Sequence, residues 1–184
     1  EEALAPLRKA VQIQPSYPAS WQNLLIALAD LERWDEAHAV AREAVAANPS
    51  DAALAGGQDW LHWRRARVAA TRREWSSAAD SYTLATSGRF ANNGEAWFEL
   101  AAVQVLAGDA AAFRTVCNSM LERCENAGLR KFLAARACTL APLSEEVLAR
   151  ATRLGMEELV QNAGAHWSLT ARGALAFREG RAAD

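Results

Sequence analysis

The segment 59–74 carries side chains that could bind a protein partner. Trp60 and Arg64 are four positions apart, as are Trp63 and Arg67, so each tryptophan of a helix could stack on an arginine. Aromatic and arginine side chains are the usual anchors of protein interfaces. Five arginines fall between positions 64 and 73. This local positive charge predicts an acidic or aromatic-containing partner segment.

A second interpretation of these residues stays open beside the first. The tryptophans could pack against residues 50–58, with the arginines only solvated. That preceding stretch contains Gly56-Gly57, which interrupts a helical pattern. It predicts a long loop, an extended and kinked helix start, or a hinge.

No group of residues in the sequence has the spacing of a catalytic or metal site. The three histidines are far apart and lack ligand spacing. There is no phosphate-binding glycine loop and no Gly-x-Ser-x-Gly motif. The pairs Glu145-Glu146 and Glu157-Glu158 would point apart on a helix. We therefore predict no catalytic residue, no metal, no cofactor and no enzymatic activity.

The elements that position the tryptophan–arginine segment are helices with small faces. Residues 34–49 read WDEAHAVAREAVAANP, and their alanines fall on one side of a helix. The alanines of this face are Ala37, Ala41 and Ala44. Small side chains let a second helix approach closely. Asn48-Pro49 ends the helix, because a residue before proline avoids the helical conformation.

The same pattern occurs 34 residues earlier, over residues 3–15. A period near 34 in helical sequence predicts a solenoid of helix pairs. Trp21-x-x-Leu24 lies between the two copies and resembles the opening W-x-x-L of the tetratricopeptide repeat (TPR). Further along the chain, Trp97-x-x-Leu100-Ala101 resembles the W-x-x-L-G of this repeat. The chain thus resembles the TPR family. The resemblance implies an all-α, right-handed superhelix of antiparallel helix pairs.

On this pattern, residues 1–184 form one TPR-like domain that starts and ends within a repeat. The repeats expected are 1–17 (partial), 18–51, 59–93, 94–128, 129–164 (degenerate) and 165–184 (partial). The small contact residues expected in their first helices are Ala66, Ala101, Ala137 and Gly173. Gly88 is expected to cap a helix, and Gly155 to end or kink one. The partial end repeats predict that the chain belongs to a longer protein or a complex.

In the TPR family the first helices line the concave, partner-binding face. The resemblance therefore implies that the tryptophans and arginines point into this groove. Two residues of neighbouring first helices join them. The predicted partner-binding residues are Gln22, Trp60, Trp63, Arg64, Arg67 and Phe98. The function expected is a protein–protein interaction scaffold that binds a peptide or protein.

A second resemblance concerns the segments FRTVCNSMLERC and LAARACTLAP. They are similar to the TPR part of large bacterial proteins with a serine/threonine kinase or a WD40 propeller ahead of the repeats. The matching residues are Phe113, Cys117, Met120, Leu121, Cys138, Leu140 and Pro142. This implies an alternative function: a regulatory or substrate-docking region of an enzyme whose catalytic domain lies outside the chain.

Composition and charge also bear on the class of partner and on the cellular compartment. The net charge of -2 argues against a nucleic-acid partner, and the apolar runs are too short for a membrane span. The three cysteines, an odd number without disulfide spacing, indicate reduced thiols and a cytoplasmic protein. We expect Cys117 and Cys124, seven positions apart on one helix, to be small core residues.

Overall fold

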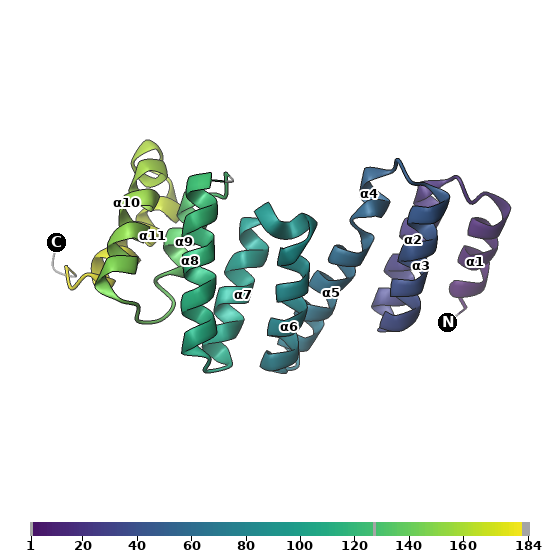
Figure 1. The fold of residues 1–184 in the computed structure, drawn as a ribbon, viewed down its shortest axis with the longest axis horizontal. Helices are drawn as coiled ribbons and strands as arrows, with labels where there is room; N and C mark the ends of the chain where they lie inside the picture. The colour runs from purple at the N-terminus through teal and green to yellow at the C-terminus, as the bar shows by residue number, and fades with distance from the viewer. Residues whose placement is uncertain (1, 127, 182–184) are drawn as a thin grey trace. The chain divides into compact units, whose positions relative to one another are not determined.

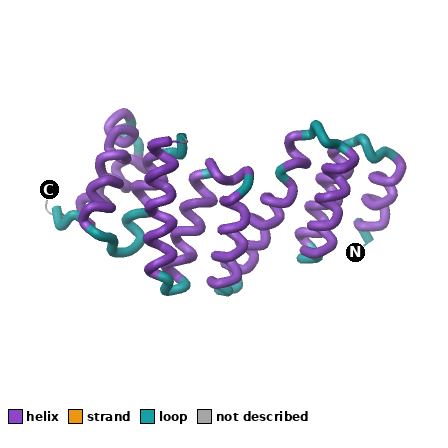
Figure 2. The backbone as a smooth tube through the Cα atoms, viewed as in Figure 1, coloured by secondary structure: helices purple, strands orange, loops and turns teal. Residues whose placement is uncertain are grey.

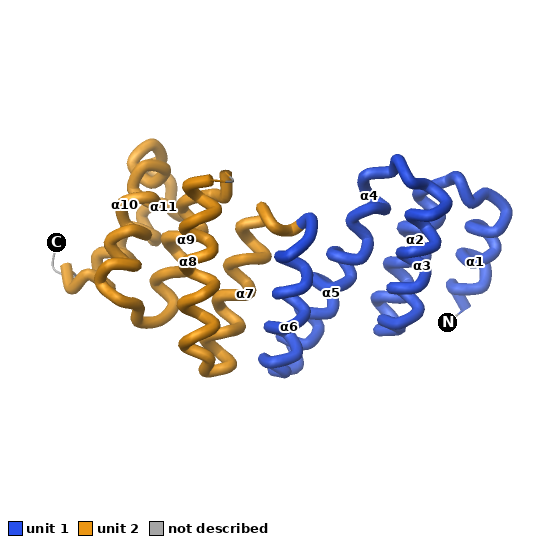
Figure 3. The backbone as a smooth tube through the Cα atoms, viewed as in Figure 1, with its two compact units in different colours: residues 1–89 blue, residues 90–184 orange. Residues whose placement is uncertain are grey.

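The computed structural model describes residues 2–126 and 128–181. In this part the chain folds into eleven α-helices and one short 3-10 helix, with no strand (Figures 1 and 2). The all-α class predicted from sequence is confirmed. The chain divides into two compact units, residues 1–89 and 90–184 (Figure 3).

Unit 1 is built on the alanine face found in the sequence. Its helices are α1 (Leu4–Ile13), α2 (Pro18–Asp30), α3 (Trp34–Ala47), α4 (Ala52–Ala55), α5 (Gly57–Thr71) and α6 (Trp75–Ser87). Ala37, Ala41 and Ala44 are each at most 1% exposed. They join Leu24 and Leu28 of α2 in one apolar core. The helix α5 packs against α3 on one side and α6 on the other.

Residues 50–58 form a kinked helix start, one of the alternatives that the sequence left open. Asp51 caps α4 by accepting a hydrogen bond from the Leu54 N–H at 2.8 Å. Gly56 then separates α4 from α5 (Figure 1). Arg89 holds the junction from the end of α6, because its guanidinium donates to the Ala52 carbonyl.

Gly88 ends α6 as expected, but for a different reason. Its φ of -102° is negative, so it is no left-handed cap. A Cβ atom here would lie 2.3 Å from the Asp59 carboxylate. That carboxylate also accepts the Arg89 backbone N–H at 2.7 Å. The close approach of α5 to this turn is what requires glycine.

A shared backbone motif ends four helices that the repeat pattern assigns as first helices: α2, α5, α7 and α11. At each end one residue has positive φ, and the residues are Glu32 (56°), Arg73 (60°), Gly108 (75°) and Gly180 (74°). In all four, this residue's N–H bonds to the carbonyl three positions back, and the next N–H bonds to the carbonyl five positions back. This is the Schellman motif, and its recurrence is a repeat at the level of the backbone.

Unit 2 contains α7 (Gly94–Leu106), α8 (Ala110–Asn126), α9 (Lys131–Ala137), α10 (Glu145–Gln161) and α11 (His166–Arg178). The 3-10 helix η1 (Arg89–Asn92) lies at its start. The short α9 packs against the other four helices of the unit. Phe113 and Met120, which stand at alanine positions, are at most 1% exposed. Larger side chains therefore belong to the core of this repeat.

Two glycines of unit 2 differ from their expected roles. Gly155 does not end α10, which continues to Gln161. It lies instead where α10 meets α9, and an added Cβ would fall 2.5 Å from the Ala135 Cβ. Gly173 is exposed, and no described residue lies within 4 Å of a Cβ placed there, so it is not a contact between the described helices. The other expected contacts, Ala66, Ala101 and Ala137, are each 0% exposed.

The tryptophans of the two W-x-x-L segments make equivalent hydrogen bonds. Trp21 Nε1 donates to the Pro15 carbonyl at 2.7 Å, and Trp97 Nε1 donates to the Ala91 carbonyl at 2.8 Å. Each acceptor lies six residues earlier, Pro15 in the turn before α2 and Ala91 in the 3-10 helix before α7. The Pro15 carbonyl also accepts a bond from Asn48 Nδ2 at 2.9 Å, which connects the α1–α2 turn to the end of α3.

Candidate partner-binding site

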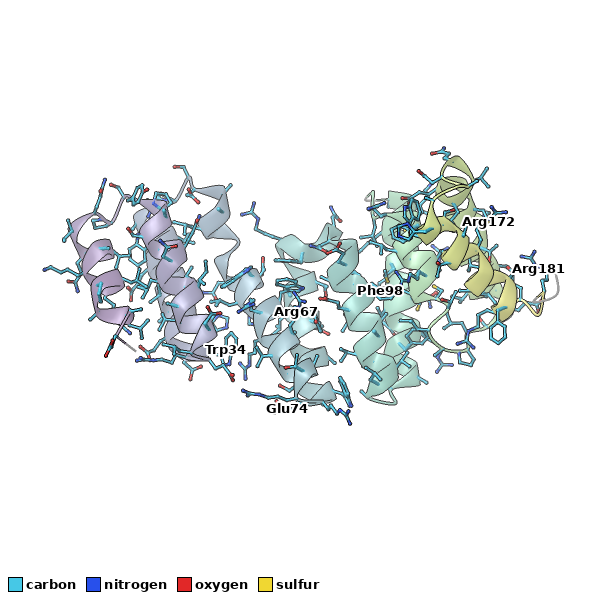
Figure 4. The ribbon with its side chains drawn as sticks, turned by 180° about the vertical axis from the view of Figure 1, so that it is seen from behind. Trp34, Arg67, Glu74, Phe98, Arg172 and Arg181 are labelled. Atoms are coloured by element: carbon cyan, nitrogen blue, oxygen red, sulfur yellow. The ribbon has the colours of Figure 1, made fainter. Side chains whose placement is uncertain are left out.

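Both tryptophan–arginine pairs expected on α5 are present in the structure. The Arg64 guanidinium carbon lies 5.9 Å from the Trp60 ring centroid, and that of Arg67 lies 4.8 Å from the Trp63 ring centroid. Figure 4 labels Arg67 on this helix. Such cation–π contacts contribute roughly 0.5–1 kcal/mol at exposed sites. They hold the arginine and tryptophan side chains in fixed positions on one side of α5.

Trp60 lines an apolar hollow between three helices of unit 1. The hollow has a volume of about 320 Å³ and is lined by Gln22, Leu25, Ile26, Ala53, Leu54, Gly57 and Trp60. The structure thus brings together Gln22 and Trp60, two residues predicted from sequence. The indole is half-buried and also packs on the core of unit 1. Ala53, Leu54 and Gly57 line the same hollow as Trp60, so both interpretations of this tryptophan stay open.

Arg64 is held in place by an acidic residue of α2. Its Nη2 donates to Asp30 Oδ1 at 2.6 Å, and both side chains stay partly exposed, at 36% and 56%. Its Nε is buried and makes no hydrogen bond within the described residues. Arg72 pairs in the same way with Glu32, at 2.5 Å. Two of the arginine charges of α5 are thus partly compensated by acids at the end of α2, which reduces the positive charge expected from sequence.

Phe98, the sixth predicted residue, belongs to unit 2. It lies on α7 and is half-buried. The Arg136 guanidinium of α9 covers its ring at 5.1 Å from the centroid. Figure 4 labels Phe98 beside its neighbours in this unit. A tryptophan–arginine pattern on α5 therefore has a phenylalanine–arginine counterpart within unit 2.

Sequence reasoning missed two residues of α2 that complete the site. Ile26 lines the hollow and is 46% exposed, and Asp30 binds Arg64. Both continue from Gln22 in steps of four, so they share its helix face. That spacing was a usable signal. The contribution of Ala53 and Leu54 depended on helix α4, whose bounds were not predicted, although a kinked helix start was one of the alternatives for residues 50–58.

The thiols in the structure are unsuited to nucleophilic chemistry. All three cysteines are free and buried, as expected for Cys117 and Cys124. A hydrogen bond with Cys138, together with burial, raises the pKa of Cys117 far above its usual range. Burial raises the pKa of Cys124 to about 11. A thiol is a weak nucleophile unless it ionises.

In residues 2–126 and 128–181, no group of three or more His, Cys, Asp or Glu side chains could hold a metal ion. No helix in the same ranges is long and apolar enough to span a bilayer.

No protein-family model matches the chain, and no curated protein matches it. The TPR resemblance therefore depends on the residues and helix ends described above.

Proposed function

We propose that this chain is a non-catalytic protein–protein interaction scaffold of the TPR type. In this proposal the helix pairs form a right-handed superhelix, and the first helices line its concave face. Support comes from the Schellman ends shared by α2, α5, α7 and α11. Equivalent tryptophan bonds at the W-x-x-L segments support it further.

The observation that carries the proposed binding role is the hollow shared by Gln22, Ile26 and Trp60. Its lining is apolar, and its volume of about 320 Å³ is sufficient for one large side chain. An exposed isoleucine at its edge gives a partner apolar surface to cover. We therefore expect the partner to insert an aromatic or large aliphatic side chain here.

The arginines beside the hollow define the rest of the partner. The Arg64 side chain stays 36% exposed while its Nη2 binds Asp30, so the exposed part of its guanidinium can also donate to a carboxylate of a partner. Arg67 lies one turn further along α5, stacked on Trp63. A partner segment with a large apolar residue followed by Asp or Glu fits this arrangement. Because exposed charges are screened by salt, its binding should weaken as ionic strength rises.

A selection from a displayed library of random peptides would test this proposal. The enriched sequences should share a large apolar residue next to acidic residues. Ile26→Arg, which fills the hollow, should lower the affinity of a selected peptide by about tenfold or more. Leu84→Arg is the matched control, because Leu84 is a similarly exposed apolar residue of unit 1, on α6. It should leave the affinity unchanged.

The charged half of the site needs a separate pair of variants. Arg64→Gln with Arg67→Gln removes two charges without placing a carboxylate beside Asp30. The control is Arg114→Gln with Arg172→Gln, which changes the net charge equally at exposed sites of unit 2. Only the first pair should reduce both affinity and its salt dependence. Equal binding by Ile26→Arg and the unaltered chain would refute the proposed site.

A further inference from the structure

Two histidines lie against each other where α3 packs on α5. The ring centroids of His38 and His62 are 4.6 Å apart, and their planes are inclined by 41°. His38 comes from α3 and His62 from α5, so this contact joins two successive helix pairs. The proposed binding site does not use either ring. His62 nevertheless lies between Trp60 and Trp63 in the sequence of α5.

Hydrogen bonds to Gln58 determine which nitrogen of His38 carries the proton. Gln58 Nε2 donates to the His38 carbonyl at 2.8 Å, which fixes the orientation of the amide. Gln58 Oε1 therefore faces His38 Nδ1, at 2.5 Å. An amide oxygen can only accept, so Nδ1 is the protonated nitrogen. The side chain of Gln58 thereby anchors His38 to α5 at neutral pH.

His62 occupies a position that disfavours its charged form. Its Nδ1 is buried and has no hydrogen-bond partner in the described residues. Burial lowers the pKa of His62, and the nearby His38 and Arg65 lower it further, while Asp59 acts in the opposite direction. Asp59 is itself engaged by the Arg89 backbone N–H. Protonation of His62 is therefore disfavoured by burial and by the two neighbouring side chains His38 and Arg65.

The other charged groups near this contact do not offer His62 a direct partner. Asp30 of α2 pairs with Arg64, and Glu36 of α3 pairs with Arg8 and Arg33. Arg65 lines a shallow hollow with Glu32, Arg33, Trp34, Asp35 and Glu36, at the α2–α3 turn. The helix α6 has one charged side chain, Asp80, which is exposed.

We propose that the His38–His62 contact makes the packing of α3 against α5 sensitive to mild acid, tight near neutral pH and loosened when His62 binds a proton. The direction follows from linkage. A histidine whose pKa is lower in the folded chain favours folding only while it is neutral. Its contribution is complete above the pKa of the unfolded chain, near 6.5, and is lost as pH falls through the lower folded value.

The test measures stability without any partner. Urea unfolding followed by circular dichroism, at about pH 7.5 and about pH 5.5, brackets the range in which histidine charges. The unfolding equilibrium constant of the unaltered chain should rise several-fold on acidification. His62→Gln should remove most of that rise, whatever its own stability at neutral pH. His166→Gln is the matched control, because His166 is exposed on α11 in unit 2, and it should keep the full rise.

A direct titration covers the case in which His62→Gln folds poorly. The Cε1–H resonances of the three histidines can be followed by NMR and assigned with the two variants. His62 should titrate below 6.5, the usual value for histidine. A titration of His62 at or above 6.5 would overturn the proposal. So would an equal acid response in the His62→Gln and unaltered chains.

A consequence for binding rests on the proposed function. Because Trp60 and Trp63 flank His62, a selected peptide should bind more weakly at about pH 5.5 than at about pH 7.5. Loss of the acid response in stability would refute the histidine contact alone. Failure of Ile26→Arg to weaken binding would refute the site alone.

Discussion

Replacing Arg73 with glycine should stabilise the chain, although the substitution removes a whole side chain. Arg73 has a φ of 60°, in the left-handed region that L-residues avoid. That conformation costs a residue with a Cβ about 1–2 kcal/mol. Glycine also has more conformational freedom in the unfolded chain, which stabilises the unfolded state by about 0.5–1 kcal/mol and offsets part of this gain. The net expectation is a stabilisation of about 0.5–1 kcal/mol.

The equivalent turn in unit 2 supplies the reverse experiment. Gly108 has a φ of 75°, and a Cβ placed there would meet no atom within 4 Å. Gly108→Ala therefore introduces the backbone strain without a clash. It should destabilise the chain by about 0.5–1 kcal/mol, opposite in sign to Arg73→Gly.

Urea and thermal unfolding, followed by circular dichroism, measure both changes. For a chain of this length, about 1 kcal/mol corresponds to roughly 2–4 °C in melting temperature. Arg73→Ala is the control, because it removes the same side chain but keeps the strained φ, and it should give no gain. If Arg73→Gly and Arg73→Ala behave alike, the left-handed turn carries no cost and the reasoning is wrong.

Two further predictions concern the cores of the two units. Ala44→Trp should destabilise unit 1 by about 1–3 kcal/mol or more, because Ala44 is 0% exposed and its helix face has no room for a larger side chain. An unchanged melting temperature would refute this packing. In unit 2, Cys124 should react with iodoacetamide at about pH 8 far more slowly in the folded chain than in urea, because burial raises its pKa to about 11. Equal rates in the two conditions would show that the thiol is accessible.

The alanine pattern predicted much of the fold because small residues leave a direct periodic signal. Ala66, Ala101 and Ala137 are all buried, as their spacing predicts for helix contacts. Gly173 follows the same spacing and is exposed. Glycine also occurs in turns and at exposed positions, so its spacing alone does not predict a helix contact. Whether it is one depends on how its helix packs. Gly155 shows the converse, since a glycine expected to break α10 instead permits close contact with α9.

The candidate site was predictable along α5 and less so across helices. Spacing within one helix fixed the Trp60–Arg64 and Trp63–Arg67 pairs, because residues four apart are always neighbours. The Arg64–Asp30 ion pair depends on how α5 lies on α2, and local spacing holds no such information. The hollow further required α4, whose four residues give too short a pattern to recognise.

The Pro15 carbonyl oxygen accepts two hydrogen bonds, which has a consequence for local unfolding of unit 1. In a helical repeat array, each element is stabilised mainly by its nearest neighbours, so an end helix can fray independently. Here one oxygen accepts from Trp21 of α2 and from Asn48 at the end of α3. Displacing the α1–α2 turn would therefore leave two buried donors unsatisfied in two further helices. The amide protons of α1, α2 and α3 should consequently exchange with solvent as one cooperative group, with no separate fraying of α1.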